Sequence, residues 1–133
     1  MKKLLLIITV FVTSLSYCQT AVEYFDSGYS KDELQEYQGA IADFSKAIEL
    51  DPNYSSAYNN RGISKYNLQD YQGAIADYSK AIELDPNDSD AYYNRGLSKL
   101  KLNQKNSACL DWSKAAKLGR EVDTYKLIKE HCN

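Results

Sequence analysis

Charged residues that recur at a fixed spacing are the first candidates for chemistry in this sequence of 133 residues. Asp43, Asp77 and Asp111 stand 34 residues apart, and Arg61 and Arg95 repeat with the same interval. Such a ladder of charges could bind a ligand. In the alternative interpretation each arginine is structural and donates two parallel N–H···O bonds to the aspartate of a neighbouring helix. The structural interpretation predicts that replacing Asp77 with alanine lowers the melting temperature.

Few other residues are candidates for catalysis or metal binding. The one histidine, His131, lies two residues before the last residue and beside Glu130, and we expect it to be exposed rather than a general base or metal ligand. No His, Cys and carboxylate cluster has metal-ligand spacing, and no glycine-rich phosphate loop or nucleophile elbow occurs. The sequence therefore predicts no catalytic residue, no metal and no cofactor, and a protein that is not an enzyme.

The recurring charges belong to a longer internal repeat. Tyr37–Asn53 and Tyr71–Asn87 are identical at 16 of 17 positions, and the one difference, Phe44 against Tyr78, keeps an aromatic ring. A weaker third copy follows at Lys105–Lys117. Self-similarity at this period is typical of stacked helical hairpins.

Each copy has the apolar periodicity and the stop signal of a helix. Asp85-Pro86 and Asp51-Pro52 end the copies, because proline cannot continue a helix and pushes the preceding residue into an extended conformation. The apolar residues of the second copy fall on one face of a helix: Ala74, Ile75, Tyr78, Ala81 and Ile82.

A glycine also recurs in the helix that precedes each copy, at Gly28, Gly62 and Gly96. Glycine inside a helix costs roughly 1 kcal/mol relative to alanine, so its recurrence predicts a packing reason. Without a Cβ atom the partner helix can approach closely. We expect the three glycines to face Ala40, Ala74 and Ala108, respectively.

These positions together resemble the tetratricopeptide repeat (TPR) family, whose pattern runs aromatic, glycine, alanine, aromatic, alanine, proline. In the central repeat these residues are Tyr58, Gly62, Ala74, Tyr78, Ala81 and Pro86. The first repeat has Tyr24, Gly28, Ala40, Phe44, Ala47 and Pro52, and the third has Tyr92, Gly96, Ala108, Trp112 and Ala115, with Arg120 in place of the proline. The family usually has leucine where this chain has Ser27, Arg61 and Arg95.

The resemblance implies an all-α fold, a right-handed α-solenoid of three helical hairpins at residues 21–54, 55–88 and 89–122. A C-terminal capping helix is expected at residues 121–133, after Gly119 as a helix C-cap. Its apolar residues, Val122, Tyr125, Leu127 and Ile128, would cover the last hairpin, as the end of a solenoid requires.

The resemblance also implies that the first helix of each hairpin lines a concave groove that binds a peptide or a partner protein. Aromatic rings supply contact area at low entropy cost, and carboxamides can hydrogen-bond to an extended backbone. In the alternative interpretation these residues only pack helix to helix. The residues expected to point inward are Phe25, Tyr29, Asn59, Asn60, Ile63, Tyr93, Asn94, Leu97 and Lys101.

One specialisation of the family is disfavoured. Repeats that bind the C-terminal carboxylate of chaperone tails use a lysine and an asparagine where this chain has Phe25 and Tyr29, although Asn60 is compatible.

The first 18 residues have the layout of a secretory signal peptide. Lys2 and Lys3 precede an apolar run at Leu4–Val12, and Ser16 and Cys18 take the −3 and −1 places of a cut before Gln19. An uncleaved anchor is less compatible, because the run is short against the roughly 20 residues of a spanning helix. A lipoprotein signal with Cys18 as the lipidated residue is the other alternative, although Tyr17 is bulky for that motif.

Charge and cysteine content then limit the partners and the compartment. Without Lys2 and Lys3, 14 basic residues face 18 acidic ones, a net charge of −4, and no basic run occurs. We therefore expect neither nucleic acid nor an anionic membrane surface as a partner. Cys109 and Cys132 would remain as a pair in an oxidising compartment and are predicted to form a disulfide. Cys109 could instead be a small buried apolar residue.

The sequence thus predicts an exported, periplasmic or secreted TPR adaptor or scaffold of the cell envelope, with no membrane-spanning segment after cleavage. Two alternatives remain: a self-assembling structural protein, in which copies form a homo-oligomer, and a lipid-anchored envelope component.

Overall fold

The computed structural model describes residues 19–132. The predicted signal peptide at residues 1–18, with Cys18, and Asn133 lie outside the described residues. Antiparallel helices follow one another in the described part, and no strand occurs between residues 19 and 132. The helices are α2 (Ala21–Glu33), α3 (Tyr37–Leu50), α4 (Ser55–Asn67), α5 (Tyr71–Leu84), α6 (Ser89–Lys101), α7 (Lys105–Ala115), the π-helical turn η1 (Ala116–Arg120) and α8 (Glu121–His131).

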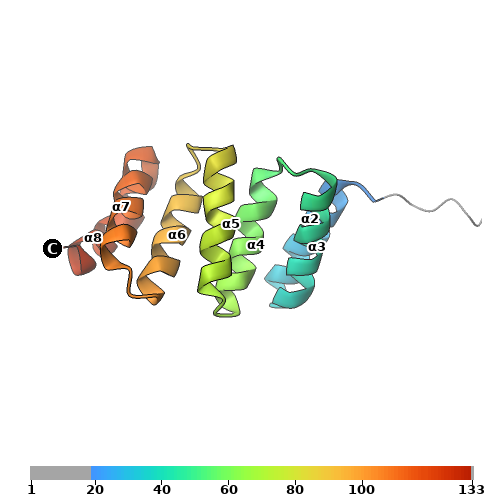
Figure 1. Ribbon diagram of the computed structural model, residues 1–133, viewed down its shortest axis with the longest axis horizontal. Helices are drawn as coiled ribbons and strands as arrows, with labels where there is room; N and C mark the ends of the chain where they lie inside the picture. Colours follow the sequence, from blue (N-terminus) through green and yellow to red (C-terminus); the bar gives the residue numbers. More distant parts are fainter. Residues whose placement is uncertain (1–18, 133) are drawn as a thin grey trace, which may run out of the picture.

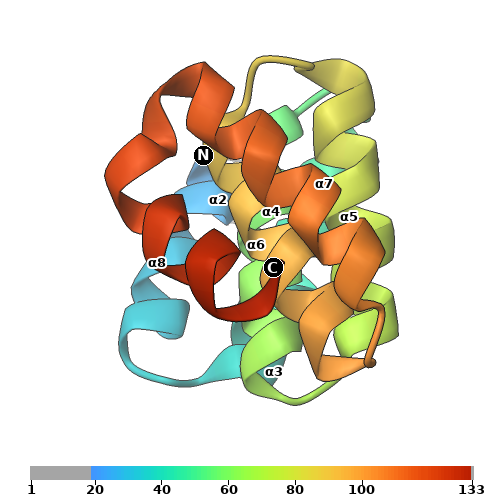
Figure 2. The ribbon, with the colours of Figure 1, turned by 90° about the vertical axis from the view of Figure 1, so that its left-hand side faces the viewer.

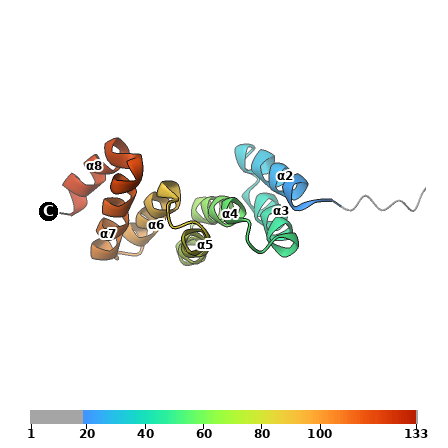
Figure 3. The same ribbon diagram turned by 90° about the horizontal axis from the view of Figure 1, so that it is seen from above.

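The helices pair as hairpins α2–α3, α4–α5 and α6–α7, which lie side by side in chain order (Figure 1). From above, α2, α4 and α6 lie along one side of the array and α3, α5 and α7 along the other (Figure 3). The C-terminal helix α8 packs on α7 and covers that end of the array (Figure 2). The prediction of an all-α solenoid of three hairpins with a capping helix is confirmed.

Two helix ends fall at the prolines, as predicted. Helices α3 and α5 end at Leu50 and Leu84, and the next residues, Asp51 and Asp85, are extended with φ of −136° and −134°. Helix α6, which follows α5, has a side-chain cap at its N-terminus. The Asp88 carboxylate accepts hydrogen bonds from the N–H groups of Asp90 and Ala91 in the first turn of α6. The other junction has no side-chain cap, since α4 begins after Tyr54 without one.

The turn inside each hairpin contains a residue in the left-handed conformation. These are Gln35, Gln69 and Asn103, with φ of 62°, 64° and 59°, again 34 residues apart. In the central hairpin the Asp70 N–H donates to Lys65 O at 2.9 Å, and the Gln69 N–H donates to Tyr66 O at 2.9 Å. This pattern satisfies the last carbonyls of α4 and turns the chain into α5.

One buried aromatic ring fills each hairpin: Phe44, Tyr78 and Trp112. A Cβ atom at Gly62 would lie 2.7 Å from Cε1 of Tyr78, and one at Gly28 would lie 2.9 Å from Cε1 of Phe44. The expectation that the glycines face alanines is therefore wrong, because they face rings. A long helical side chain leans back toward the N-terminus of its helix, which places the ring over the turn that holds the buried alanine.

The capping helix α8 packs on the last hairpin with only some of the apolar residues that were predicted to cover it. Gly119 has φ of 109°, which glycine adopts readily, and the chain turns there into α8. Thr124 is fully buried and donates from Oγ1 to Arg120 O at 2.7 Å. Leu127 and Ile128 are half-buried. The other two apolar residues, Val122 and Tyr125, point outward with exposed fractions of 89% and 64%.

Candidate functional site

The repeated charges form internal ion pairs. In the central hairpin Arg61 donates from Nε to Asp77 Oδ2 at 2.9 Å and from Nη2 to Asp77 Oδ1 at 2.7 Å. Lys65 Nζ lies 2.7 Å from the same carboxylate, and Arg61 Nη1 donates to Ser45 Oγ of the preceding hairpin at 3.0 Å. Asp77 is only 4% exposed. The predicted structural role is confirmed, since a ligand does not reach this carboxylate.

The third hairpin repeats the arrangement of the central one, and the first hairpin has a simpler arrangement. Arg95, Lys99, Asp111 and Ser79 reproduce the central contacts with the same distances. In the first hairpin Ser27 stands in place of the arginine, and Asp43 accepts from Ser27 Oγ and Lys31 Nζ, both at 2.6 Å. We name the sets around Asp77 and Asp111 the Arg–Asp rungs, and the set around Asp43 the Ser–Asp rung.

The nine residues predicted to line the groove lie on α2, α4 and α6, and each is at least partly exposed. Helices α2 and α8 stand at the two ends of the row (Figure 3). The structure thus places the nine side chains on the first helix of each hairpin, and their individual contacts differ.

Phe25 contributes mainly to packing. Its ring lies 5.0 Å from that of Tyr54 and 5.6 Å from that of Phe44, between centroids, so it fills the seam between the first two hairpins. The pKa of the Tyr54 hydroxyl is raised, first by burial and then by the negative charges of Asp26 and Asp51. Aromatic packing and negative charge therefore meet at Tyr54, beside the first helix.

Asn59, on α4, has an unsatisfied acceptor. Its Oδ1 atom is buried and has no hydrogen-bond partner within residues 19–132. The neighbouring amide of Asn60 donates from Nδ2 to Ser56 O at 2.9 Å within its own helix. A buried acceptor without a donor costs about 1–3 kcal/mol, and Asn59 Oδ1 is too enclosed for a ligand on the surface to reach it.

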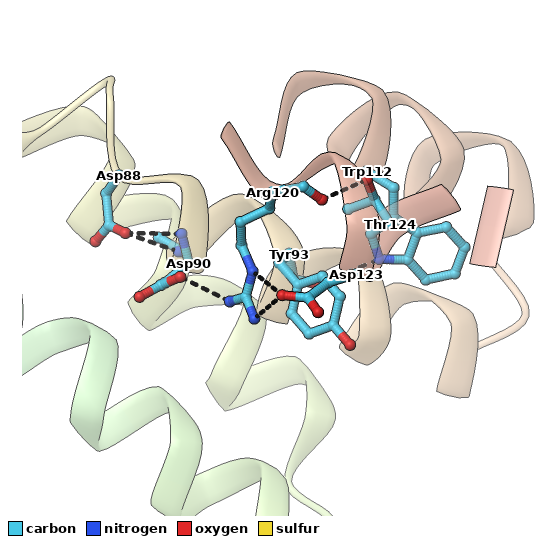
Figure 4. Close-up of polar contacts among 8 residues, drawn as sticks. Asp88, Asp90, Tyr93, Trp112, Arg120, Asp123 and Thr124 are labelled. Carbon is cyan, nitrogen blue, oxygen red and sulfur yellow. Dashed lines mark hydrogen bonds and ion pairs between the residues drawn. The ribbon is translucent and has the colours of Figure 1, made fainter. Parts of the chain in front are cut away.

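Tyr93 is covered by a residue that the sequence analysis did not select. The guanidinium carbon of Arg120 lies 4.2 Å from the centre of the Tyr93 ring, a cation–π contact (Figure 4). Arg120 also donates from Nη1 to Asp90 at 2.6 Å and from Nη2 to Asp123 at 2.8 Å. Burial lowers the pKa of Arg120, but the hydrogen bond to Asp123 and the negative charges of Asp90 and Asp123 together outweigh burial. The pKa of Arg120 is therefore raised overall.

The contacts of Arg120 join the capping segment to α6, and only one sequence signal points to them. Arg120 occupies the place of the proline in the third repeat, where the first two repeats have Pro52 and Pro86. This departure is the one signal that the position differs, and it does not indicate that the Arg120 side chain turns back over Tyr93.

Cys109 lies in α7, and Cys132 directly follows α8. The structure places their sulfur atoms 2.05 Å apart and their Cα atoms 5.7 Å apart, a geometry that is compatible with the predicted disulfide. Such a bond would tie α7 to the end of α8. Beside it the rings of His131 and Trp112 lie 6.0 Å apart between centroids, so His131 packs against the last hairpin rather than standing free.

The remaining surface features do not coincide with the groove. Two hollows of about 330 and 220 Å³ lie at residues 103–107, where α7 begins, and between α5 and the turn that joins α6 to α7, and neither includes any of the nine predicted groove residues. Within residues 19–132, no group of three or more His, Cys, Asp and Glu side chains could hold a metal ion. The helices described there are too short or too polar to cross a membrane.

Comparisons with known proteins agree with this architecture. A family model described as TPR repeat matches residues 28–69 and 64–103. The first TPR of Spaghetti (RPAP3), solved with the HSP90 peptide SRMEEVD, is similar with a TM-score of 0.83 and 21% identity, over 86% of this chain and 91% of that chain. Its second TPR, with the same peptide, has a TM-score of 0.74 and 28% identity over 75% and 93%.

A third similar structure is the TPR2B domain of yeast Sti1 in a pHsp70 complex, with a TM-score of 0.73 and 26% identity over 83% of this chain and 88% of that chain. A comparison with curated proteins gave no match.

Proposed function

Since the chain belongs to the tetratricopeptide repeat family, we propose that it is an interaction module that holds a peptide segment or a partner protein in the groove along α2, α4 and α6. The similar domains of Spaghetti and Sti1 were solved with HSP90 and pHsp70 partners, which supports peptide binding as the function. No reaction is assigned to the chain.

The observation that carries this proposal is the row of partly exposed side chains on α2, α4 and α6, which includes the carboxamides of Asn59, Asn60 and Asn94. An extended peptide offers matching groups, because carboxamides can hydrogen-bond to backbone amides. The half-exposed side chains of Ile63 and Leu97 lie on the neighbouring turns of α4 and α6 and offer apolar contact to the same segment.

The charge of the groove separates this chain from repeats that bind acidic tails. The first helix presents the exposed carboxylates of Asp26 and Glu33, and Arg120 is already paired with Asp90 and Asp123. An acidic peptide such as SRMEEVD would therefore meet like charge at α2. We expect it to bind this protein weakly, so that it serves as a negative control.

A peptide array tests the groove directly. Wild-type protein is compared with an Asn59→Ala, Asn94→Ala double variant, and with Leu110→Ala as a matched surface variant on α7, where Leu110 is 73% exposed. The double variant is expected to lose at least tenfold in affinity for the peptides that the wild type binds, while Leu110→Ala keeps them. Equal binding by all three proteins would place the interaction surface outside this groove.

The cellular setting is part of the proposal. We propose an exported protein of the cell envelope, cut before Gln19 and oxidised at Cys109 and Cys132, on the basis of the leader pattern and the paired cysteines. Mass spectrometry of the exported, non-reduced protein measures both features. Two free thiols, or an N-terminus other than Gln19, would contradict it.

A further inference from the structure

The capping segment shows how this fold holds a guanidinium group. The guanidinium carbon of Arg120 lies 4.2 Å from the centre of the Tyr93 ring (Figure 4). Its Nη1 atom donates to Asp90 at 2.6 Å, and its Nη2 atom donates to Asp123 at 2.8 Å. Asp90 and Tyr93 stand three residues apart on α6, a spacing that brings their side chains to one face of the helix. One aromatic ring and two carboxylates thus form an arginine site.

The first helix presents the same kinds of side chain without an arginine. Asp26 and Tyr29 stand three residues apart on α2, the same spacing as in the pair on α6. Glu33 follows Tyr29 by four residues and lies on the same face of α2. All three residues are exposed, Tyr29 by 48%. We name this set the α2 face, and it lies in the predicted groove because Tyr29 is one of the nine predicted groove residues.

The α2 face has no partner inside the described part of the chain. Within residues 19–132 the carboxylates of Asp26 and Glu33 have no ion-pair or hydrogen-bond partner, and the Tyr29 ring makes no aromatic or cation–π contact. The site on α6 differs in this respect, because Arg120 already occupies it. A cation of another molecule can therefore reach the ring and both carboxylates of the α2 face.

The charge around the α2 face favours a cationic partner. Helix α2 contains four acidic residues and one basic residue, a net charge of −3. The basic residue, Lys31, pairs with Asp43 at 2.6 Å. The two basic residues of the neighbouring helix α4 both pair with Asp77. No cation of α2 or α4 is thus left to neutralise the α2 face.

We propose that the α2 face binds an arginine side chain of the partner segment, with the guanidinium group stacked on Tyr29 and its N–H groups donating to Asp26 and Glu33. Arginine fits this site better than lysine, because a planar guanidinium can stack on a ring while its edge donates to carboxylates. The inference rests on the proposed groove function and specifies the chemistry of the partner: a peptide segment with an arginine at the α2 end of the groove.

The test compares three labelled peptide libraries by fluorescence polarisation with the full chain. Each peptide has one fixed central residue, which is arginine, lysine or citrulline, and uncharged residues elsewhere. Citrulline has the shape of arginine without its positive charge. Wild type is expected to bind the arginine library about five- to tenfold more tightly than the citrulline library, with the lysine library in between. This preference is expected to fall at 0.5 M salt, because salt screens exposed charges.

Two variants separate the charges of the site from its ring. Asp26→Asn with Glu33→Gln removes both charges at nearly constant shape, and is expected to bind the arginine library as weakly as the citrulline library. Its affinity for the citrulline library is expected to equal that of wild type. Tyr29→Leu keeps both carboxylates and an apolar side chain but removes the ring, and is expected to bind the arginine and lysine libraries equally.

A matched control separates the site from a general effect of net charge. Glu36→Gln with Glu121→Gln removes two exposed carboxylates from the turn after α2 and from the start of α8, and is expected to keep the full preference for arginine. Circular dichroism establishes that each variant folds, and the charge variant and Tyr29→Leu are each informative if the other does not fold.

Three outcomes would overturn the arginine site: equal binding of the arginine and citrulline libraries by wild type, equal binding of the arginine and lysine libraries by wild type, or an arginine preference that survives in the charge variant. In each of these cases wild type still binds peptides, so the groove function stands. Wild type that binds none of the three libraries would instead contradict the groove function, and the arginine site with it.

Discussion

In the first two hairpins, the helices α3 and α5 are almost identical in sequence, whereas their partner helices α2 and α4 differ. Helices α3 and α5 differ only at Phe44 and Tyr78, yet the side chain of Asp43 is 15% exposed and that of Asp77 is 6% exposed. Asp43 accepts from a serine and a lysine, whereas Asp77 accepts two hydrogen bonds from Arg61 and pairs with Lys65. The environment of the carboxylate is thus determined by the helix opposite it, and not by its own sequence.

The preceding hairpin accounts for part of this difference. Arg61 places its third donor on Ser45, and Arg95 places its third donor on Ser79, each on the second helix of the hairpin before. No described hairpin precedes α2, so an arginine at position 27 would have no such acceptor. An Arg–Asp rung therefore joins two hairpins, whereas the Ser–Asp rung acts within one.

The largest expected difference between the hairpins concerns their aspartates. Asp77→Ala leaves Arg61 and Lys65 half-buried without an anion and is expected to cost about 3 kcal/mol of unfolding free energy. Asp43→Ala removes a more exposed pair and is expected to cost about 1 kcal/mol or less. Urea denaturation midpoints at unchanged m-value measure both, and equal losses would show that the two rungs are equivalent.

The glycines opposite the rings provide the next comparison. An added Cβ at Gly62 would meet the enclosed ring of Tyr78 at 2.7 Å, so Gly62→Ala is expected to cost about 2 kcal/mol through overpacking. Gly28→Ala is expected to cost about 1 kcal/mol, since Phe44 lies at 2.9 Å in a hairpin that, within residues 19–132, packs against a neighbouring hairpin on one side. Thermal melting separates these values. A larger loss for Gly28→Ala would mean that the first hairpin is packed as tightly as the second.

The sequence was sufficient for features that repeat with a chemical signature. Proline at positions 52 and 86 ended the helices where predicted, and the recurrence of both Arg61 and Asp77 after 34 residues, at Arg95 and Asp111, identified the rung. It was insufficient where a long side chain reaches another element. The ring of Tyr78 covers Gly62 although the pattern suggested Ala74. Arg120 covers Tyr93 because the chain turns at Gly119, where φ is 109°, and the first two repeats have no such turn.

Converting the Ser–Asp rung tests how much the missing acceptor matters. In Ser27→Arg the guanidinium can reach Asp43, but Lys31 already pairs with that carboxylate and no serine precedes it. We expect a gain of about 0.5–1 kcal/mol at low salt, of the size of a partly exposed ion pair, that falls at 0.5 M salt. The measurement is the urea midpoint at both salt concentrations. A gain of 3 kcal/mol would show that the first hairpin can form a complete rung by itself.

The hairpin turns are the part in which the first and second hairpins agree. Gln35 and Gln69 have φ of 62° and 64°, a conformation that costs a non-glycine residue roughly 1–2 kcal/mol. Glycine removes that cost but adds roughly 0.5–1 kcal/mol of unfolded-state entropy, so Gln35→Gly and Gln69→Gly should each stabilise by about 0.5 kcal/mol. Asn103→Gly should gain less, because asparagine tolerates this conformation better. Unequal gains for the two glutamines, measured by urea denaturation, would mean that the difference between the hairpins extends into their turns.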